Sequence, residues 1–272
     1  MEVTFTVGIC IYDGVSVCEL KRSIESILNQ DCCDFELIVY LDGVSNQELI
    51  NLINGYSDKL KVINGNVNRG LSFGLNEIIK NMSGDYFVRM DADDVSLNNR
   101  LSRQLEFLID NPDIDIVGSG IRQKNIEDIN SKELDVFYPE GHDEIVKYFK
   151  YKNPIAHPTV VFRKSVFNLV PSYPVFSIKN EDTLMWLSAI NAGLKFANIP
   201  EVLYVFNYND ETESRRLGFK KAFSDYVDRV RVQLDLGCSF KDIILSLSVF
   251  FISLTPLYKV IRKFYFENLS SK

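Results

Sequence analysis

An acidic cluster directly follows an apolar run near residue 90. The run Tyr86 to Met90 is followed by Asp91, Asp93 and Asp94, three carboxylates within four residues. An apolar run of this length is typical of a buried strand, so the acids should lie at the strand's carboxyl end, where ligands bind in open α/β sheets. Crowded carboxylates repel one another unless a cation lies between them, and Mg²⁺ is commonly held by carboxylates together with substrate phosphates. The cluster predicts a metal-diphosphate site; the alternative is a solvated acidic turn that caps the next helix.

Apolar runs alternate with helical patterns through the first hundred residues. The expected strands are Phe5 to Ile11, Phe35 to Leu41, Leu60 to Ile63 and Tyr86 to Met90. The expected helices are Glu19 to Leu28, Gln47 to Ile53 and Leu71 to Ile79. Such alternation predicts an α/β fold with βαβ units and a mainly parallel sheet. The loops after the strands then bring Tyr12, Asp42, Arg69 and the acidic cluster to one edge of that sheet.

The next hundred residues are less regular. The expected helices are Arg100 to Ile109, one near Asp143 to Tyr148, and Thr183 to Asn191, which begins just after Asn180-Glu181-Asp182. The expected strands are Ile114 to Val117 and Thr159 to Phe162, with a polar stretch between Val117 and Asp135.

Composition narrows the classes of partner and compartment. The 272 residues are 46% hydrophobic and 25% charged, as in folded globular proteins. A net charge of −7 gives no general attraction for phosphate backbones, so no nucleic-acid partner is expected. The five cysteines are odd in number without a CxxC pair, and the amino terminus does not have a secretory signal pattern. Reduced thiols in the cytoplasm are therefore expected.

The composition changes from Leu217 onward. A basic helix carrying Lys220, Lys221, Arg229 and Arg231 is followed by the almost wholly apolar run Ile243 to Leu254. A helix of that run spans roughly 18 Å, well short of the ~30 Å hydrocarbon core of a membrane. Pro256 ends the run, and Lys259, Arg262 and Lys263 follow beside three aromatic residues, Phe264 to Phe266. This mixture predicts contact with an anionic membrane surface; the alternative is a helix packed on the core or in a dimer.

Several ordered motifs make residues 4 to 215 resemble the family 2 glycosyltransferases, which are inverting enzymes with the GT-A nucleotide-diphospho-sugar fold. The motifs are Ile11-Tyr12-Asp13, Ser26 to Gln30 with Asp34 to Val39, Asp42-Gly43, Asn68-Arg69-Gly70, Leu75-Asn76, Ser83 to Tyr86, Met90 to Asp94 and Glu181-Asp182. The resemblance implies a catalytic domain over residues 1–216, with a nucleotide-sugar half at 1–100 and an acceptor half at 101–216. Residues 217–272 then form a C-terminal helical extension.

The resemblance also implies roles for the donor-side residues. Tyr12 would stack on a nucleobase while Asp42 accepts the imide N–H of uracil, and Arg69 would contact the ribose, base or phosphate side of the donor. Asp91 would bind the ribose hydroxyls or metal-bound water, and Asp93 would ligate Mg²⁺ or Mn²⁺. Ordinary packing of Tyr12 and a surface position of Arg69 are the plainer alternatives.

On the acceptor side, Asp182 is the general-base candidate and Glu181 is its partner in the acidic pair. An inverting transfer needs a carboxylate to take the acceptor hydroxyl's proton. Helix capping is the structural alternative for Asp182, and a hydrogen-bonded structural histidine is the alternative to an acceptor contact for His157. Three positions depart from the family pattern: Leu41 replaces an acid, and Asn207 and Asn209 replace an Arg and a His. Arg215 or Arg216 could supply the missing diphosphate clamp.

The expected activity is transfer of a hexose from a UDP-sugar to a hydroxyl of an acceptor glycan. The short chain, the His157-Pro158-Thr159 segment and the apolar, basic tail look like bacterial enzymes that extend O-antigen or capsule repeat units on a polyprenyl diphosphate. A cytoplasmic protein, peripheral on the inner face of the cell membrane, is therefore expected. Two rival functions are a metal-dependent phosphohydrolase and a non-catalytic nucleotide-sugar binding protein.

Overall fold

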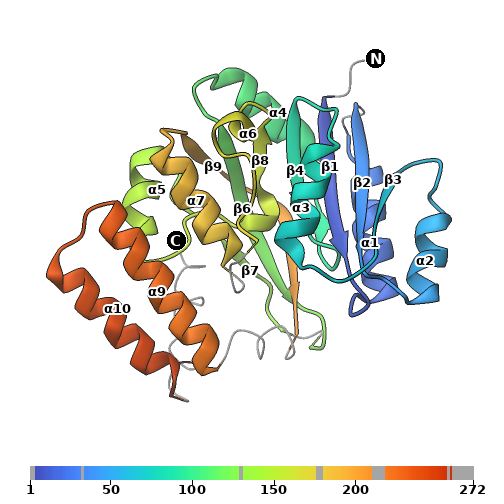
Figure 1. The fold of residues 1–272 in the computed structure, drawn as a ribbon. Helices are drawn as coiled ribbons and strands as arrows, with labels where there is room; N and C mark the ends of the chain where they lie inside the picture. The colour runs from blue at the N-terminus through green and yellow to red at the C-terminus, as the bar shows by residue number, and fades with distance from the viewer. Residues whose placement is uncertain are drawn as a thin grey trace.

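Apolar strands form the centre of the molecule, with helices on both faces (Figure 1). The computed structural model describes residues 4–31, 34–128, 131–175, 180–209, 218–255 and 258. The strands are β1 Phe5–Ile11, β2 Phe35–Asp42, β3 Lys61–Gly65, β4 Tyr86–Met90, β5 Val95–Ser96, β6 Ile116–Asn125, β7 Leu134–Val136, β8 Val161–Arg163 and β9 Phe196–Tyr208. The helices are α1 Val17–Leu28, α2 Gln47–Asn54, α3 Leu71–Lys80, α4 Arg100–Asp110, α5 His142–Phe149, α6 Val166–Leu169, α7 Glu181–Asn191, α9 Phe219–Asp235 and α10 Phe240–Ser253, with a 3-10 turn η1 at His157–Thr159.

The sheet has nine strands in the order β3-β2-β1-β4-β8-β6-β9-β5, and β7 pairs with β6. β1 pairs in parallel with β2 and β4, and β2 pairs in parallel with β3. β8 enters antiparallel to both β4 and β6, while β6 and β9 run parallel. The expected mainly parallel α/β sheet is confirmed, and strands from residues 1–100 and 101–216 belong to the same sheet.

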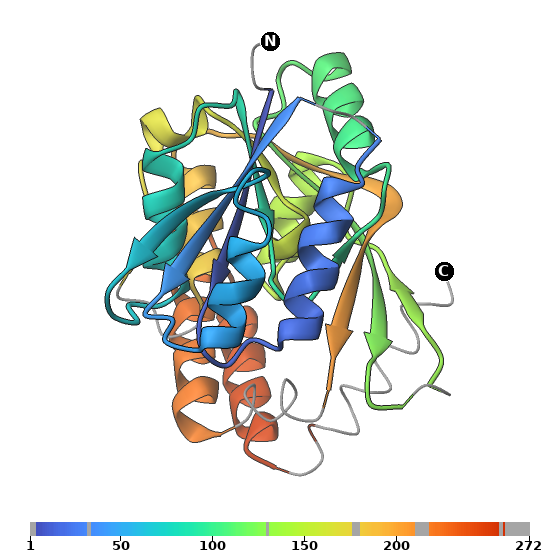
Figure 2. The same ribbon diagram turned by 90° about the vertical axis from the view of Figure 1, so that its right-hand side faces the viewer.

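Alternating side chains of the strands reach two cores. On β2, Leu37 and Val39 face one core with α1, α2 and α4, whereas Ile38 and Tyr40 face the other with α3, α5 and α7. Figure 2 shows α1 and α2 in front of the sheet and α3 behind it. Because both faces are covered, the strands read as nearly continuous apolar runs.

The polar stretch expected after Val117 is in large part strand. β6 continues to Asn125, where Arg122, Gln123 and Lys124 pair with β9 on one side, and Arg122 and Gln123 pair with β7 on the other. These side chains are partly or fully exposed, so no apolar run marks the strand. The strand expected to start at Thr159 starts at Val161 instead, because residues 157–159 form the turn η1.

The expected C-terminal helical extension is present as α9 and α10. α9 packs beside α7, and the buried Gln233 donates hydrogen bonds to the Lys150 carbonyl at 2.9 Å and to Ser246 of α10 at 2.8 Å. Across residues 4–255, gaps aside, no helix has both the length and the apolar character needed to cross a membrane. The basic and aromatic segment from Lys259 to Phe266 lies outside the described residues.

Candidate active site

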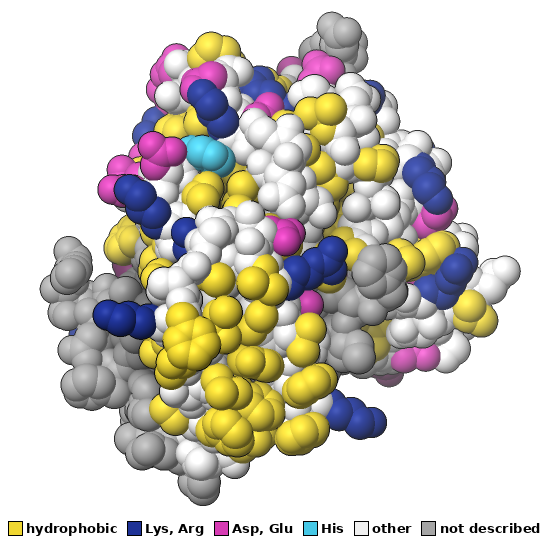
Figure 3. Space-filling view, turned by 60° about the vertical axis from the view of Figure 1, so that its left-hand side comes forward, with side chains coloured by type: hydrophobic (Ala, Val, Ile, Leu, Met, Phe, Trp, Pro, Cys, Tyr) yellow, Lys and Arg dark blue, Asp and Glu magenta, His cyan; other side chains and the backbone are white. Residues whose placement is uncertain are grey.

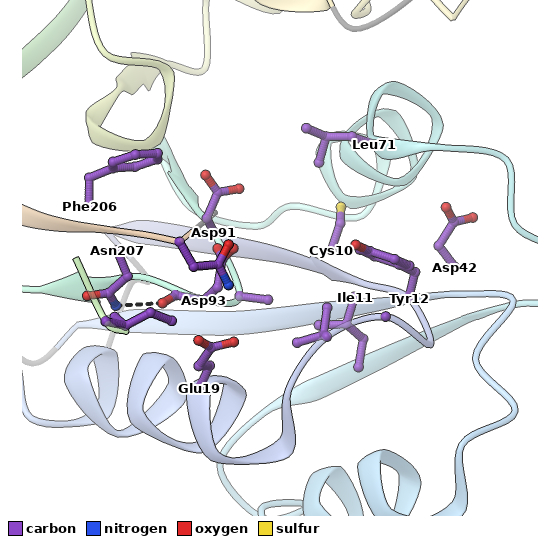
Figure 4. A pocket seen from close by; sticks show the side chains of 15 residues that line it. Cys10, Ile11, Tyr12, Glu19, Asp42, Leu71, Asp91, Asp93, Phe206 and Asn207 are labelled. Carbon is purple, nitrogen blue, oxygen red and sulfur yellow. Dashed lines mark hydrogen bonds between the residues drawn. The ribbon is translucent and has the colours of Figure 1, made fainter. Parts of the chain in front are cut away.

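The carboxyl ends of β1, β2 and β4 open into one cavity of about 340 Å³ (Figure 4). The register aligns Ile9 with Met90 and Ile11 with Leu41, so the loops that follow the three strands begin side by side. Four predicted donor-site residues line this cavity: Tyr12, Asp42, Asp91 and Asp93. Cys10, Glu19, Leu71, Phe206, Asn207 and Asn209 also line it. We call this cavity the strand-end cavity.

The acidic cluster converges as the spacing predicted. One carboxylate oxygen from each of Asp91, Asp93 and Asp94 can be chosen so that all three lie within 4.8 Å of one another. The buried Arg89 forms an ion pair with Asp91, and its two terminal nitrogens lie 2.5 and 2.6 Å from the Asp91 carboxylate oxygens. Asp94 is 1% exposed, and its Oδ2 has no hydrogen-bond partner among the described residues. The cluster therefore gathers more negative charge than its protein contacts neutralise.

Crowding also changes the protonation of the acids. Burial, and then the neighbouring Asp91, raise the pKa of Asp93 to about 6, although its side chain opens to solvent at the cavity. Burial, followed by Asp91 and Asp93, raises the pKa of Asp94 well above the ordinary range. A bound cation would reverse both effects, because an opposite charge favours ionised carboxylates. The residues present fit a divalent metal, and Asp91 and Asp93 are the ligand candidates that face the cavity.

Asn207 from β9 supports the acidic loop. Its side-chain amide donates to the Asp93 carbonyl at 2.7 Å, the contact dashed in Figure 4, and its backbone N–H donates to Asp94 Oδ1 at 2.8 Å. The antiparallel pairing of β9 with β5 places it there, with Val95 opposite Val205. Sequence reasoning treated Asn207 as a departure from a pattern and missed this role. Arg215 and Arg216, suggested as substitutes, lie outside the described residues.

Asp42 joins two loops of the predicted donor site. Its oxygens accept hydrogen bonds from the backbone N–H groups of Arg69 at 2.7 Å and Gly70 at 2.8 Å. The next residue, Gly43, has φ +65°, and a Cβ there would lie 2.4 Å from the Asn68 nitrogen, so the turn requires glycine. Each carboxylate oxygen can accept a second hydrogen bond, so Asp42 can still receive a base N–H from the cavity.

Tyr12 and Arg69 flank the strand-end cavity differently. Tyr12 is 37% exposed and presents its ring to the cavity, as stacking on a base would require. Arg69 does not line the cavity; its guanidinium lies over the Phe73 ring, 3.6 Å from the centroid. An exposed guanidinium can move from that cation–π contact to an anionic ligand. Arg69 is therefore adjacent to the site through its backbone but outside it through its side chain.

The acidic pair begins α7 and does not line the strand-end cavity. Asp182 accepts hydrogen bonds from the Asn153 amide at 2.7 Å and from the Thr183 N–H at 2.7 Å. Burial raises the pKa of Asp182, and burial followed by Asp182 raises the pKa of Glu181. Arg89 and Asp91 also influence the pKa of Glu181, so the pair lies within electrostatic reach of the acidic cluster. Sequence reasoning missed Asn153, because no local pattern links positions 29 residues apart.

His157 and Cys10 have structural surroundings. His157 is 8% exposed, its Nε2 is 3.0 Å from the Tyr173 hydroxyl, and Trp186 packs against its ring. Burial, and then Arg89, lower its pKa well below the usual value, so the ring stays neutral. Burial raises the pKa of the Cys10 thiol, which is free, as are Cys18 and Cys238. Cys32 and Cys33 lie outside the described residues.

The family model of Glycosyl transferase family 2 matches residues 6–169, which run from the second residue of β1 past the end of β8 and include the acidic cluster. The chain belongs to this family. A relative from Escherichia coli, "O-antigen biosynthesis glycosyltransferase WbnJ", is 34% identical over 208 residues, which cover 74% of this chain and 80% of the relative. The resemblance to the family 2 glycosyltransferases is thereby confirmed.

Two further proteins are similar to nearly the whole chain. A second Escherichia coli protein, "UDP-Gal:alpha-D-GlcNAc-diphosphoundecaprenol beta-1,3-galactosyltransferase", is 29% identical over 274 residues, covering 96% of this chain and 97% of the relative. The structure of residues 1–349 of Staphylococcus aureus TarS in complex with UDP-GlcNAc superposes with a TM-score of 0.62 at 17% identity, covering 93% of this chain and 82% of that one. This structural likeness to TarS confirms the expected GT-A type of fold.

Proposed function

We propose that this family 2 glycosyltransferase moves a hexose from a UDP-sugar to a hydroxyl of a polyprenyl-diphosphate-linked glycan, with inversion at the anomeric carbon. The observation that carries the proposal is the strand-end cavity, where Tyr12, Asp42, Asp91 and Asp93 meet. Support for the donor and acceptor comes from the galactosyltransferase relative, which aligns with almost the whole chain and whose own substrates are UDP-Gal and a GlcNAc-diphosphoundecaprenol.

In this proposal the donor lies with its uracil between Tyr12 and Asp42 and its ribose toward Asp91. The acceptor hydroxyl oxygen attacks the anomeric carbon from the face opposite the diphosphate. A glycosidic C–O bond forms, the anomeric C–O bond to the β-phosphate breaks, and UDP leaves with that electron pair. Asp182 takes the hydroxyl proton, and its raised pKa suits a group that must accept a proton near neutral pH. Glu181 is the second acid of this proposed catalytic pair.

Mg²⁺ or Mn²⁺ is the proposed cofactor, held by Asp93 and Asp91. When bound, the ion would neutralise charge on the departing diphosphate. Arg89 orients Asp91 toward the cavity, while Asn207 fixes the backbone that carries Asp93. In this proposal residues 1–100, which carry Tyr12, Asp42, Asp91 and Asp93, form the nucleotide-sugar half. Residues 101–216, which carry Asp182, form the acceptor half.

The experiment is a screen of nucleotide sugars with and without a GlcNAc-diphosphate-lipid acceptor, following nucleotide release. The proposal expects release from a UDP-hexose that depends on acceptor and on divalent metal. Asp182→Asn should retain UDP binding while turnover falls by about 10²–10⁴-fold, the usual contribution of a general base. Asp93→Ala should lose metal-dependent turnover, and the exposed Asp110→Asn should match the wild type.

The same screen separates the rival functions. A metal-dependent phosphohydrolase would release phosphate or sugar at equal rates without acceptor. A non-catalytic nucleotide-sugar binding protein would bind UDP and release nothing. Wild-type rates for Asp182→Asn would contradict the assigned base.

We also propose that the extension places the enzyme on the inner face of the cell membrane, as a peripheral cytoplasmic protein. Figure 3 shows hydrophobic side chains gathered over the C-terminal helices. This α9–α10 face contains exposed residues from both helices: Phe219, Phe223, Val227, Leu234, Phe240, Ile244, Leu245, Leu247, Val249, Phe251 and Leu254. Exposed apolar patches of this kind mark interaction sites, and a lipid-linked acceptor requires an enzyme at the membrane surface.

A further inference from the structure

A second cavity, of about 610 Å³, lies between the C-terminal helices and the catalytic core. Its volume falls in the range of ligand sites, roughly 300–1,000 Å³. Its apolar wall is formed mainly by aromatic and aliphatic side chains, among them Phe137, Tyr226, Leu245, Val249, Phe250 and Ile252. We call it the helix-pair cavity. None of the predicted donor-site residues lines it, so it is distinct from the strand-end cavity.

The helix-pair cavity is connected to the proposed base by two of its lining residues, through the Asn153 side-chain amide and the Thr183 backbone N–H. Asn153 and Thr183 both line it, and both donate hydrogen bonds to Asp182. The Thr183 hydroxyl also donates to the Asn153 side-chain oxygen at 2.9 Å, so the three residues form one network. A ligand in this cavity would therefore lie beside the group that must deprotonate the acceptor.

Basic side chains line the same cavity close to that network. Lys152, Lys221 and Arg229 are among the lining residues, together with Asp225 and Asp228. The Lys221 ammonium donates to Asn180 Oδ1 at 2.8 Å and pairs with Asp225, while Arg229 donates to the Phe149 carbonyl. A diphosphate offers stronger acceptors than the Asn180 amide or the Phe149 carbonyl, because hydrogen bonds between charged groups are shorter and stronger, while Asp225 remains a competing carboxylate at Lys221.

The apolar part of the cavity continues onto the α9–α10 face. Leu245 and Val249 of α10 line the cavity, yet they are 51% and 50% exposed. They lie one helical turn apart, and Ile252 extends the same stripe. An isoprenoid chain could therefore run from the cavity along this stripe to the surface that we propose meets the membrane.

We propose that the helix-pair cavity binds the lipid-linked acceptor, with its diphosphate toward Lys221 and its first isoprene units against Leu245 and Val249. This inference rests on the proposed function, since it places that reaction's acceptor. The bound ligand is a membrane lipid, because a free sugar would bury no apolar surface against the aliphatic stripe. The glycan beyond the diphosphate then extends toward Asp182.

The test measures KM for GlcNAc-diphosphate acceptors carrying one, three or eleven isoprene units, with the donor identified in the screen. For the wild type, KM should fall about tenfold or more between one and three units, because those units bury apolar surface. Val249→Trp fills the cavity and should abolish this chain-length effect. Ile109→Trp, at a 63% exposed residue of α4 that does not line the cavity, should retain it. UDP affinity and the melting temperature of each variant check that the donor site and the fold are intact.

A second pair of variants tests the charged part without filling the cavity. Lys221→Met should raise KM severalfold for a diphosphate acceptor and less for the matching monophosphate. Lys220→Met, the exposed neighbour that does not line the cavity, should leave both KM values unchanged.

The inference is overturned if Val249→Trp keeps the full chain-length effect, or if Lys221→Met and Lys220→Met behave alike. Failure of the proposed function has a different signature, since the wild type would then transfer no sugar to any of these acceptors.

Discussion

Asp182 is held by two donors, and both favour its charged form. The Asn153 amide and the Thr183 N–H each lie 2.7 Å from its carboxylate, and they oppose the burial that raises its pKa. Because a base acts only when deprotonated, kcat should fall as the pH drops through this raised value. The acid limb of the profile should therefore lie above the ordinary 3.8 of an aspartate.

Removal of the Asn153 hydrogen bond to Asp182 should shift the acid limb of the kcat–pH profile to higher pH. Asn153→Ala deletes a hydrogen bond to the charged form, so the pKa of Asp182 should rise further and the acid limb of kcat should shift to higher pH. A pH–rate profile of the two proteins, at saturating donor and acceptor, measures the shift. An identical midpoint in both would exclude Asp182 as the titrating base.

At the scale of elements, β9 supports the acidic loop through two hydrogen bonds from Asn207. Asn207→Ala removes the hydrogen bond to the Asp93 carbonyl but leaves the backbone contact to Asp94. A neutral hydrogen bond contributes about 0.5–1.5 kcal/mol, so the apparent Kd of Mn²⁺ in the presence of UDP should rise roughly two- to tenfold. Calorimetric titration measures this change, and an unaltered Kd would mean that the loop keeps its shape without β9.

The elements that sequence could predict are those whose own residues carry the signal. β1, β2 and β4 are buried on both faces, so their apolar runs marked them to within a residue. The polar half of β6 carried no such run, because pairing with β7 and β9 forms it.

The same limit applies to the site. Asp91, Asp93 and Asp94 are adjacent in sequence, and their convergence could be predicted from one strand end. Asn207 contacts the acidic loop although it lies 113–114 residues away in the sequence. Arg89 lies inside the apolar run Tyr86 to Met90, so its role was not visible in the sequence. Such partners are set by the pairing of distant strands and by burial, which a local pattern does not contain.

At the scale of the whole molecule, the acidic cluster should reduce stability when no metal is bound. In the folded protein the pKa of Asp93 is raised from 3.8 to about 6. The contribution of Asp93 to the free energy of unfolding is therefore fully present below about pH 4 and is lost as the pH rises through 6. Without metal, Asp93→Asn should gain in melting temperature relative to the wild type as the pH rises from 5 to 7. Mn²⁺ should stabilise the wild type more at pH 7 than at pH 5. A metal effect of equal size at both pH values would contradict the cluster as the binding site.

The α9–α10 face is expected to bind a membrane surface. Phe240 and Phe251 are 77% and 59% exposed on α10, and their burial in lipid would favour binding to a bilayer surface. The double variant Phe240→Glu/Phe251→Glu should float with anionic vesicles at least about tenfold less than the wild type. Ile109→Glu changes a 63% exposed residue on α4 and serves as the matched control. Equal flotation of the double variant and the wild type would remove this face as the anchor.

The central claim is an inverting transfer from a UDP-hexose in the strand-end cavity. Its most direct test is the NMR spectrum of the product formed from a UDP-α-hexose and a GlcNAc-diphosphate-lipid. The account predicts a new β-glycosidic linkage, formed by the wild type and lost with Asp182→Asn while UDP binding persists. An α-linked product, or free hexose in place of a glycoside, would contradict it.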